Sequence, residues 1–201
     1  RDSSAAFHIA NCAVSLACAS RYQAVSIALG ARISRHNLNV LQASKGAECV
    51  IDGLALITGH QLADTHSLVD HAQPHGVSRQ SHKCIVDGAA HAVFNGKIMV
   101  RPGAQRTDSS QSSRNLLLTG KARIDTKPQL EIFADDVKCA HGATVGQLDD
   151  EEVFYLRSRG LSDAAARNLL TYAFGAEIID RIPVATLRQR LEQIVLAQTH
   201  R

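Results

Sequence analysis

The sequence predicts a mainly β protein, with a β-helix core over residues 1–147 and a small α-helical C-terminal domain over residues 148–201. Three observations predict this fold class. Short β-like runs follow one another as far as about residue 146, without a helical period among them. A glycine-led pattern recurs along the same part of the chain. From Leu148 onward the pattern becomes helical, with helix start and stop signals.

The β-like runs are separated by Gly, Asn or Asp, residues that break strands. They include residues 24–29, 37–43, 48–57, 83–88, 92–100, 115–124 and 130–140. Aromatic residues make up only 4% of the chain and Trp is absent, so the core has to consist of Ala, Val, Ile and Leu. Such a core suits thin, repeated layers better than one large globular centre.

The recurring pattern starts at glycines that lie 16 residues apart in one case and 22 to 24 apart later on. These are Gly30, Gly46, Gly96, Gly120 and Gly142. Short strands at roughly one coil's spacing are typical of stacked coils, although a β-sandwich also fits. The hairpin dipeptide Asn-Gly occurs once, and this scarcity favours the β-helix.

Helix signals follow in the last third of the chain. Acidic residues at 149–152 and basic Arg157 and Arg159 before Gly160 suit the two ends of one helix. Ser162 opens a second helix and Pro183 a third. Their apolar stripes consist of Leu170, Phe174, Ile178 and Ile182, and of Leu187, Leu191, Ile194 and Val195. Two short helices with little else to cover suggest a docking surface for a partner.

Composition excludes several classes of protein. The net charge of +3 comes without a basic run or aromatic platforms, which argues against a nucleic-acid surface. No segment is apolar and long enough to span a membrane. The five cysteines contain no CxxC pair, which argues against a zinc ribbon and favours a reducing, cytoplasmic compartment. The chain does not begin with Met, and we expect an N-terminal region to precede it.

Sequences for nucleotide binding and for common hydrolases are absent. The Gly-Lys pairs at Gly96 and Gly120 have neither the earlier Gly nor the following Ser or Thr of a phosphate loop. We therefore expect no nucleotide to be bound by this chain. A G-x-S-x-G elbow and an H-E-x-x-H motif are also absent.

Histidines gather between residues 60 and 82. His71 and His75 have the spacing of helical metal ligands, but Pro74 between them makes a shared helix face unfavourable. We interpret this group as loop and turn histidines on a solenoid edge. His82 and Cys84 are two residues apart on a predicted strand, and Cys84 is interpreted as a buried small hydrophobe.

Cys139 and His141 are the strongest candidates for chemistry. In a strand, residues i and i+2 project to the same face, so the thiol and the imidazole project together. Both are ligands for soft transition metals. A strand pair supplies at most two ligands, whereas iron and zinc sites need about four. Spacing alone leaves open whether the two are ligands of a site completed elsewhere or ordinary side chains on a buried face.

A longer string surrounds this pair. "TKPQLEIFADDVKCAHGATVG" followed by "FYLRSRG" resembles the C-terminal portion of the SufB/SufD family, in its SufD branch, which belongs to the SufBCD iron–sulfur cluster assembly complex. "DTHSLVDHAQPHGVSRQSHK" and "AVFNGKIMVRPGAQRTD" also resemble this family, and the first 60 residues resemble it least. The SufB branch is expected to carry an acidic residue where this chain has Gly142.

The resemblance implies a right-handed parallel β-helix followed by a helical domain. It implies a non-catalytic scaffold subunit that pairs with SufB through the β-helix and docks the SufC ATPase through the C-terminal helices. It also implies that His141, with Cys139 beside it, faces SufB and contributes to a transient, shared nascent iron–sulfur cluster, with Gly142 leaving room for a partner group. An isolated chain is expected to form a homodimer.

Two other classes remain open from the sequence. One is a β-helix polysaccharide lyase or hydrolase, which needs paired carboxylates in a groove. Asp135 and Asp136 are adjacent and would point to opposite faces of a strand, which argues against it. The other is a purely structural solenoid in which the Cys and His residues have no role in chemistry.

Overall fold

The computed structural model describes residues 3–199, in which ten strands precede three helices. The strands are β1 Phe7–Leu16, β2 Arg21–Ala28, β3 Ile33–Gln42, β4 Glu48–Ile57, β5 Leu62–His71, β6 Val77–Val86, β7 His91–Val100, β8 Asp108–Leu117, β9 Arg123–Ile132 and β10 Lys138–Gly146. The helices are α1 Asp150–Ser158, α2 Asp163–Ile179 and α3 Ala185–Thr199. A run of strands followed by helices is the order that the sequence predicts.

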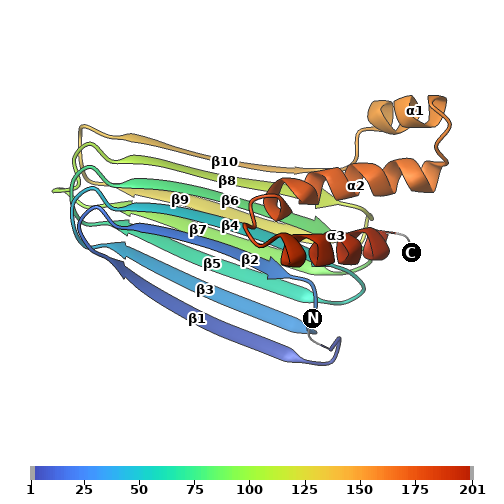
Figure 1. The fold of residues 1–201 in the computed structure, drawn as a ribbon, viewed down its shortest axis with the longest axis horizontal. Coiled ribbons are helices and arrows are strands. Elements are labelled where there is room, and N and C mark those ends of the chain that lie inside the picture. The colour runs from blue at the N-terminus through green and yellow to red at the C-terminus, as the bar shows by residue number, and fades with distance from the viewer. Residues whose placement is uncertain (1–2, 200–201) are drawn as a thin grey trace.

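The strands form two parallel sheets, one of odd-numbered and one of even-numbered strands (Figure 1). The order is β1-β3-β5-β7-β9 in one sheet and β10-β8-β6-β4-β2 in the other. Each coil therefore contributes one strand to each sheet, and successive coils stack in parallel register. This arrangement is a parallel β-solenoid, and it confirms the predicted fold class.

The coil length inferred from the glycine pattern is wrong. Phe7 pairs with Ile33, Ile33 with Leu62, Leu62 with His91 and His91 with Arg123, so one coil takes between 26 and 32 residues. The glycines of the pattern are not equivalent positions. Gly46 and Gly120 lie in turns, whereas Gly96 and Gly142 lie inside β7 and β10.

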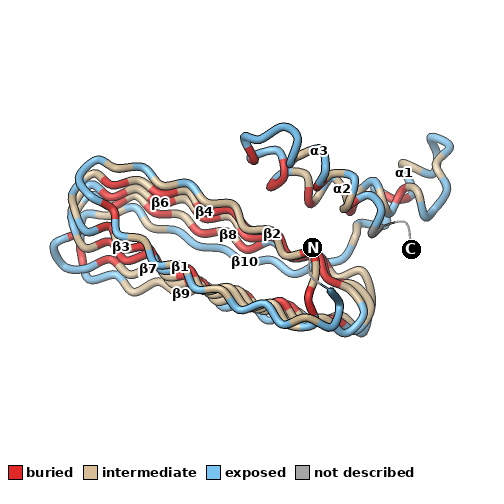
Figure 2. Tube along the Cα trace, turned by 60° about the horizontal axis from the view of Figure 1, so that its bottom comes forward, coloured by how far each residue is buried: buried red, intermediate tan, exposed pale blue. Residues whose placement is uncertain are grey.

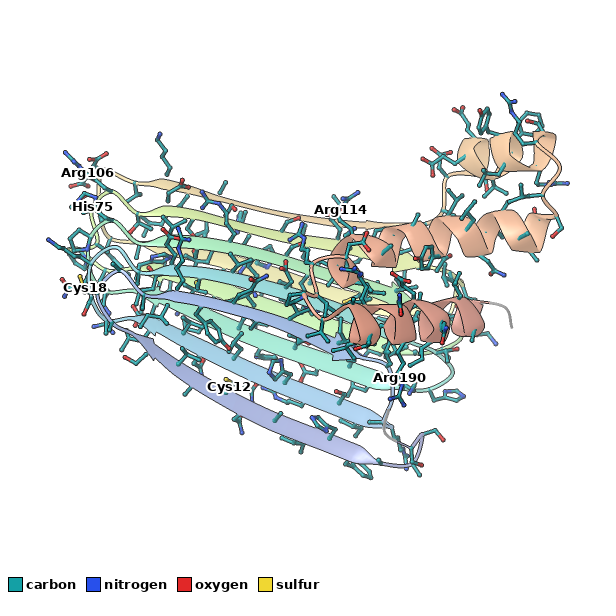
Figure 3. All side chains as sticks on the ribbon, in the orientation of Figure 1. Cys12, Cys18, His75, Arg106, Arg114 and Arg190 are labelled. Atoms are coloured by element: carbon teal, nitrogen blue, oxygen red, sulfur yellow. The ribbon has the colours of Figure 1, made fainter. Side chains whose placement is uncertain are left out.

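One corner of the solenoid is built from stacked residues in the left-handed backbone region. Ala19, Gly46, His75 and Arg106 have φ values of 53°, 68°, 61° and 58°. Each donates its backbone N–H to a carbonyl of the next coil, at Lys45, Pro74, Gln105 and Asp136 respectively. In Figure 3, Cys18, His75 and Arg106 gather at the end of the solenoid far from the helices.

Alternate residues of each strand project into the space between the two sheets. Along the even-numbered sheet these inward columns change from apolar in β4 to polar in β8. The β4 column holds Cys49, Ile51, Gly53, Ala55 and Ile57, and the β8 column holds Ser109, Gln111, Ser113 and Asn115. The polar members pair with one another across coils, as Ser78 Oγ and Ser109 Oγ do at 2.6 Å.

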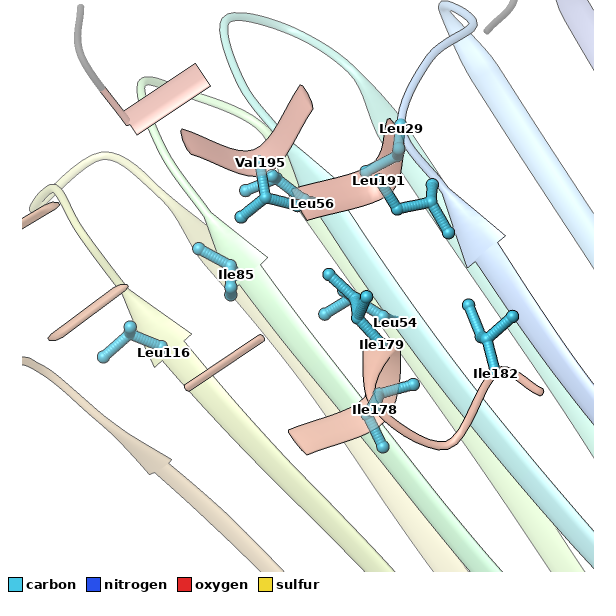
Figure 4. Packing of buried hydrophobic residues seen from close by; sticks show 10 residues of the cluster. All are labelled: Leu29, Leu54, Leu56, Ile85, Leu116, Ile178, Ile179, Ile182, Leu191 and Val195. Carbon is cyan, nitrogen blue, oxygen red and sulfur yellow. The ribbon is translucent and has the colours of Figure 1, made fainter. Parts of the chain in front are cut away.

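Helices α2 and α3 cover the outer face of the even-numbered sheet. Asp149 and Ser162 cap α1 and α2 by accepting backbone N–H bonds. Apolar residues of both helices pack on β4, β6 and β8 in one buried cluster (Figure 4). Its members are Leu29, Leu54, Leu56, Ile85, Leu116, Ile178, Ile179, Ile182, Leu191 and Val195. The predicted apolar stripes of α2 and α3 are therefore largely buried against the sheet within this chain.

Charged side chains hold α2 in place beside this apolar contact. Lys83 has a nearly buried side chain, donates to Phe174 O at 2.9 Å and pairs with Glu177. Arg181 Nη1 lies 2.6 Å from Asp52 Oδ1, which is 1% exposed as a side chain. Burial lowers the pKa of Lys83, while Glu177 opposes that shift. These pairs fix the register of α2 on the sheet.

Candidate functional site

The candidate site lies on β10, the last strand of the even-numbered sheet. β10 pairs with β8 on one side, and within the described residues its other edge has no strand beside it. Residues 138–146 are exposed apart from Cys139, and Figure 2 shows this strand almost wholly in the exposed colour. An unpaired strand edge offers backbone N–H and C=O groups to another chain.

Cys139 is half-buried at the start of β10. Its side chain packs against a small apolar cluster of Ile98, Val100, Ala104 and Ala134. Burial raises the pKa of the Cys139 thiol above its ordinary value, against a backbone hydrogen bond involving Ser109 that lowers it. The thiol form therefore predominates at neutral pH, whereas metals bind the thiolate.

His141 is exposed, and its side chain projects to the same face of β10 as that of Cys139. Cys139 pairs in register with buried Ser109, and His141 with buried Gln111, which places both on the face that looks into the solenoid. Across residues 3–199 no three His, Cys, Asp or Glu side chains come close enough together to hold a metal ion. Cys139 and His141 thus supply two donors at an edge.

Gly142 has open space around it. A Cβ built at this position meets nothing within 4 Å. Packing inside this chain therefore does not require glycine here, and a partner group has room to approach His141.

In the last coil, apolar side chains are exposed at positions whose register partners in earlier coils are buried. Ile132 is 40% exposed, whereas Val100, its register partner on β7, is fully buried. Val145 is 47% exposed, beside buried Asn115 on β8. Phe133, just after β9, is 61% exposed. Together with β10, these side chains form the open end of the solenoid, a surface of core-type residues without a cover in the described chain.

His82 and Cys84, the second His and Cys pair with i, i+2 spacing, lie in the core on β6. Cys84 is 1% exposed, which confirms its interpretation as a buried small hydrophobe, and burial raises the pKa of its thiol to about 12. His82 stacks on Phe94, with ring centroids 4.5 Å apart. The interpretation of the histidine group as loop and turn residues is partly wrong. His60 and His75 lie in turns, but His71 and His82 are buried on β5 and β6.

A cavity of about 520 Å³ lies at the opposite end of the stack, along the edges of β1 and β2. His8, His36 and His82 contribute to its lining, as does Arg190 of α3, which is labelled in Figure 3. Burial and the nearby His8 lower the pKa of His36, so this imidazole is neutral at neutral pH. Sequence reasoning missed this grouping because its members come from different coils.

Carboxylates on the outer face of the odd-numbered sheet are engaged in ion pairs. Asp64 pairs with Arg35, Asp70 with Arg101, and Glu131 with Lys97. Asp135 and Asp136 lie in the turn before β10 and are not on a strand. Carboxylates engaged in ion pairs do not form the facing pair of free carboxyl groups that a glycoside hydrolase needs.

No helix in the described part of the chain has both the length and the apolar character needed to cross a membrane.

Comparisons with known proteins match this chain to proteins of iron–sulfur cluster assembly. Residues 1–174 match the family described as SUF system FeS cluster assembly, SufBD core domain. The chain is 51% identical over 199 residues to an iron–sulfur cluster assembly SufBD family protein of Synechocystis, which covers 99% of this chain and 44% of that protein. It is 43% identical over 166 residues to the iron–sulfur cluster assembly protein SufD of Escherichia coli, covering 83% of this chain and 39% of that protein.

A plant protein is also similar. The chloroplastic protein ABCI7 of Arabidopsis thaliana is 36% identical over 191 residues, covering 94% of this chain and 40% of that protein. The chain thus spans about two fifths of the length of these relatives.

Proposed function

The chain belongs to the SufBD core family of the SUF system of iron–sulfur cluster assembly, and on that premise we propose that it is part of a SufD-type scaffold subunit. In this proposal the subunit is not an enzyme. It pairs with SufB through the open end of the solenoid and docks the SufC ATPase through its C-terminal helices. The family match, together with its similarity to SufD, carries this proposal.

The open end of the solenoid supports pairing with another β-solenoid. Ile132, Phe133 and Val145 are apolar and exposed there, beside the unpaired edge of β10. A second parallel solenoid of the same type would cover these side chains and form hydrogen bonds with the unpaired backbone groups of β10. Burial of such residues is favourable by about 25 cal/mol per Å² of apolar surface.

In the proposal His141 and Cys139 are donors to a nascent iron–sulfur cluster, which is the cargo of the complex. Imidazole and thiolate both bind iron, and the remaining ligands would come from SufB. His141 is the stronger donor of the two, because it is exposed whereas Cys139 is half-buried with a raised thiol pKa. A site divided between two chains is consistent with two donors placed at an edge.

The helical docking surface is placed on α1 in this proposal. The inner faces of α2 and α3 are occupied by the sheet. Phe154 and Tyr155 of α1 are 72% and 56% exposed, and α1 projects beyond the sheets (Figure 1). Exposed aromatic side chains of this kind are typical anchors of protein–protein interfaces.

The test is the cluster content of the assembled complex. His141→Ala in the full-length protein, co-expressed with its SufB and SufC partners, should lower iron and acid-labile sulfide per complex by about tenfold or more. Folding should survive, because an exposed imidazole adds little to packing. Cys139→Ala should lower the content no more than His141→Ala does.

Lys138→Ala is the matched control, because it truncates an exposed side chain of the same strand, on the face opposite to His141, without removing a donor. It should leave the cluster content at the wild-type level. Wild-type content in His141→Ala, in a complex that assembles normally, would contradict the proposed role of His141. The buried pair His82 and Cys84 is a poor control, since changes there disturb the core.

A further inference from the structure

A row of buried polar side chains crosses the solenoid interior and ends beside His141. Gln80 Nε2 donates to Ser67 Oγ at 2.7 Å, which links the even-numbered sheet to the odd-numbered one. Gln111 Nε2 donates to Gln80 Oε1 at 2.8 Å, which links β8 to β6. All three side chains belong to buried residues. The hydrogen bonds therefore all run the same way, because Gln111 donates to Gln80 and Gln80 donates to Ser67.

The outer end of this row is an acceptor without a donor. Gln111 Oε1 is buried and has no hydrogen-bond partner among the described residues. The amide nitrogen of Gln111 is committed to Gln80 on the β6 side, and β10 is the strand on the other side of β8. A buried acceptor that stays unpaired costs about 1–3 kcal/mol, so a donor beside it would be favourable.

His141 is the register neighbour of Gln111 on β10. Adjacent strands lie about 4.8 Å apart, and register partners project to the same face of a sheet. The imidazole of His141 and the amide of Gln111 therefore project to the same face from neighbouring strands. β8 lies on one side of β10 and the open edge on the other (Figure 1), so the two ring nitrogens can face these two sides.

We propose that Gln111 is a positioning residue for His141. In this arrangement one ring N–H of His141 donates to Gln111 Oε1, and the other ring nitrogen, which carries the lone pair, is turned to the open edge. The inference rests on the proposed function, because it assigns His141 as a donor to the cluster. Metal-ligating histidines generally donate their second N–H to an oxygen acceptor, which fixes the tautomer and the ring orientation.

The same strand provides a matched control. Asn115 on β8 also carries a buried oxygen without a partner, Oδ1. Its register neighbour on β10 is Val145, whose side chain has no hydrogen-bond donor. Asn115 Nδ2 donates to Thr144 O at 3.0 Å and so helps to hold β10. Asn115→Leu therefore loosens β10 without altering the acceptor beside His141.

The direct test reads the tautomer of His141 in the full-length protein. Ring ¹⁵N chemical shifts at pH 8 should show one fixed neutral tautomer in the wild type. Gln111→Met should give a mixture of tautomers, because it removes the oxygen acceptor beside His141. Asn115→Leu should keep the wild-type pattern. A single wild-type tautomer in Gln111→Met would overturn the positioning role.

Cluster content of the full complex is the second readout. Gln111→Met should lower iron and sulfide per complex by about tenfold, in the range seen when the partner of a metal-bound histidine is removed. Unchanged content in Gln111→Met, combined with a loss in His141→Ala, overturns the positioning role alone. Unchanged content in His141→Ala overturns the proposed function itself, whatever the tautomer.

Discussion

His71 and His82 are imidazoles enclosed in the solenoid interior. His71 Nε2 lies 2.9 Å from Ser78 Oγ, and His82 is stacked on Phe94. Burial lowers the pKa of each to about 4, with the nearby His36 adding to the shift at His82 and Asp70 opposing it at His71. Both rings are therefore neutral in the folded protein at neutral pH.

These two pKa values predict that the chain loses stability in mild acid. Between pH 6.5 and 4 the unfolded chain binds a proton at each histidine and the folded chain does not, so the free energy of unfolding falls as the pH falls. The loss reaches about 3 kcal/mol for each histidine near pH 4. Denaturant unfolding at a series of pH values measures this slope.

Substituting either histidine tests the assignment. His71→Gln and His82→Gln should each flatten the dependence of unfolding free energy on pH over this range, whatever they do to stability at pH 7. A slope that neither variant changes would mean that other groups cause the acid sensitivity.

The strand period predicts that Cys139 and His141 share a face, because it requires only the alternation of side chains. Gln111 could not be predicted in the same way. Its place beside His141 depends on pairing between strands of successive coils, and turn lengths, which no short motif encodes, set that pairing. The polar residues Ser109, Gln111 and Ser113 of β8 line the interior, where an apolar pattern alone would not place them.

At the scale of elements, helices α2 and α3 bury their apolar stripes against the even-numbered sheet. The spacing of apolar residues predicts helices close to those observed, including the capping residue Ser162. It does not tell which surface a stripe covers. Leu54 and Ile85 of the sheet meet Ile178 and Val195 of the helices only because the coils bring β4 and β6 together.

Changes on the exposed face of α1 should weaken SufC docking. Phe154→Ser with Tyr155→Ser removes the two aromatic anchors without touching the packed cluster, so the fold should persist while affinity for SufC falls by tenfold or more, or at least about 1.4 kcal/mol. Isothermal titration of the full-length variant against SufC gives this affinity.

Leu187→Ser is a suitable comparison, since it removes an apolar side chain that is 46% exposed on α3. Full affinity in the α1 variant would place the docking surface elsewhere. Deleting residues 161–201 is a less informative test, because it uncovers Leu54, Leu56, Ile85 and Leu116 and so destabilises the β body itself.

At the scale of the whole molecule, the open end of the solenoid favours association with a like surface. Without SufB, the full-length protein should form a homodimer through β10 and the exposed Val145, since the same edge is available in each copy. Light scattering should report a dimer at micromolar concentration. In hydrogen exchange, β10 amides should be more protected in the dimer than in dilute monomer.

Val145→Lys introduces a charge at this end and should shift the equilibrium toward monomer by about tenfold or more in Kd. An equivalent charge on the far corner, Ala19→Lys, should not. A clean monomer for the wild type at micromolar concentration would count against association through the open end.

The unbroken pairing of strands in successive coils determines which changes of length evolution can accept. Coils differ by up to six residues, from 26 to 32, yet every pair of neighbouring strands aligns without a bulge. Insertions and deletions among relatives should therefore fall in the turns. A single residue inserted early in β8 would exchange the two faces of that strand, sending Gln111 outward and Arg114 inward. One codon would then disrupt both the interior row and the helix contact at Glu177.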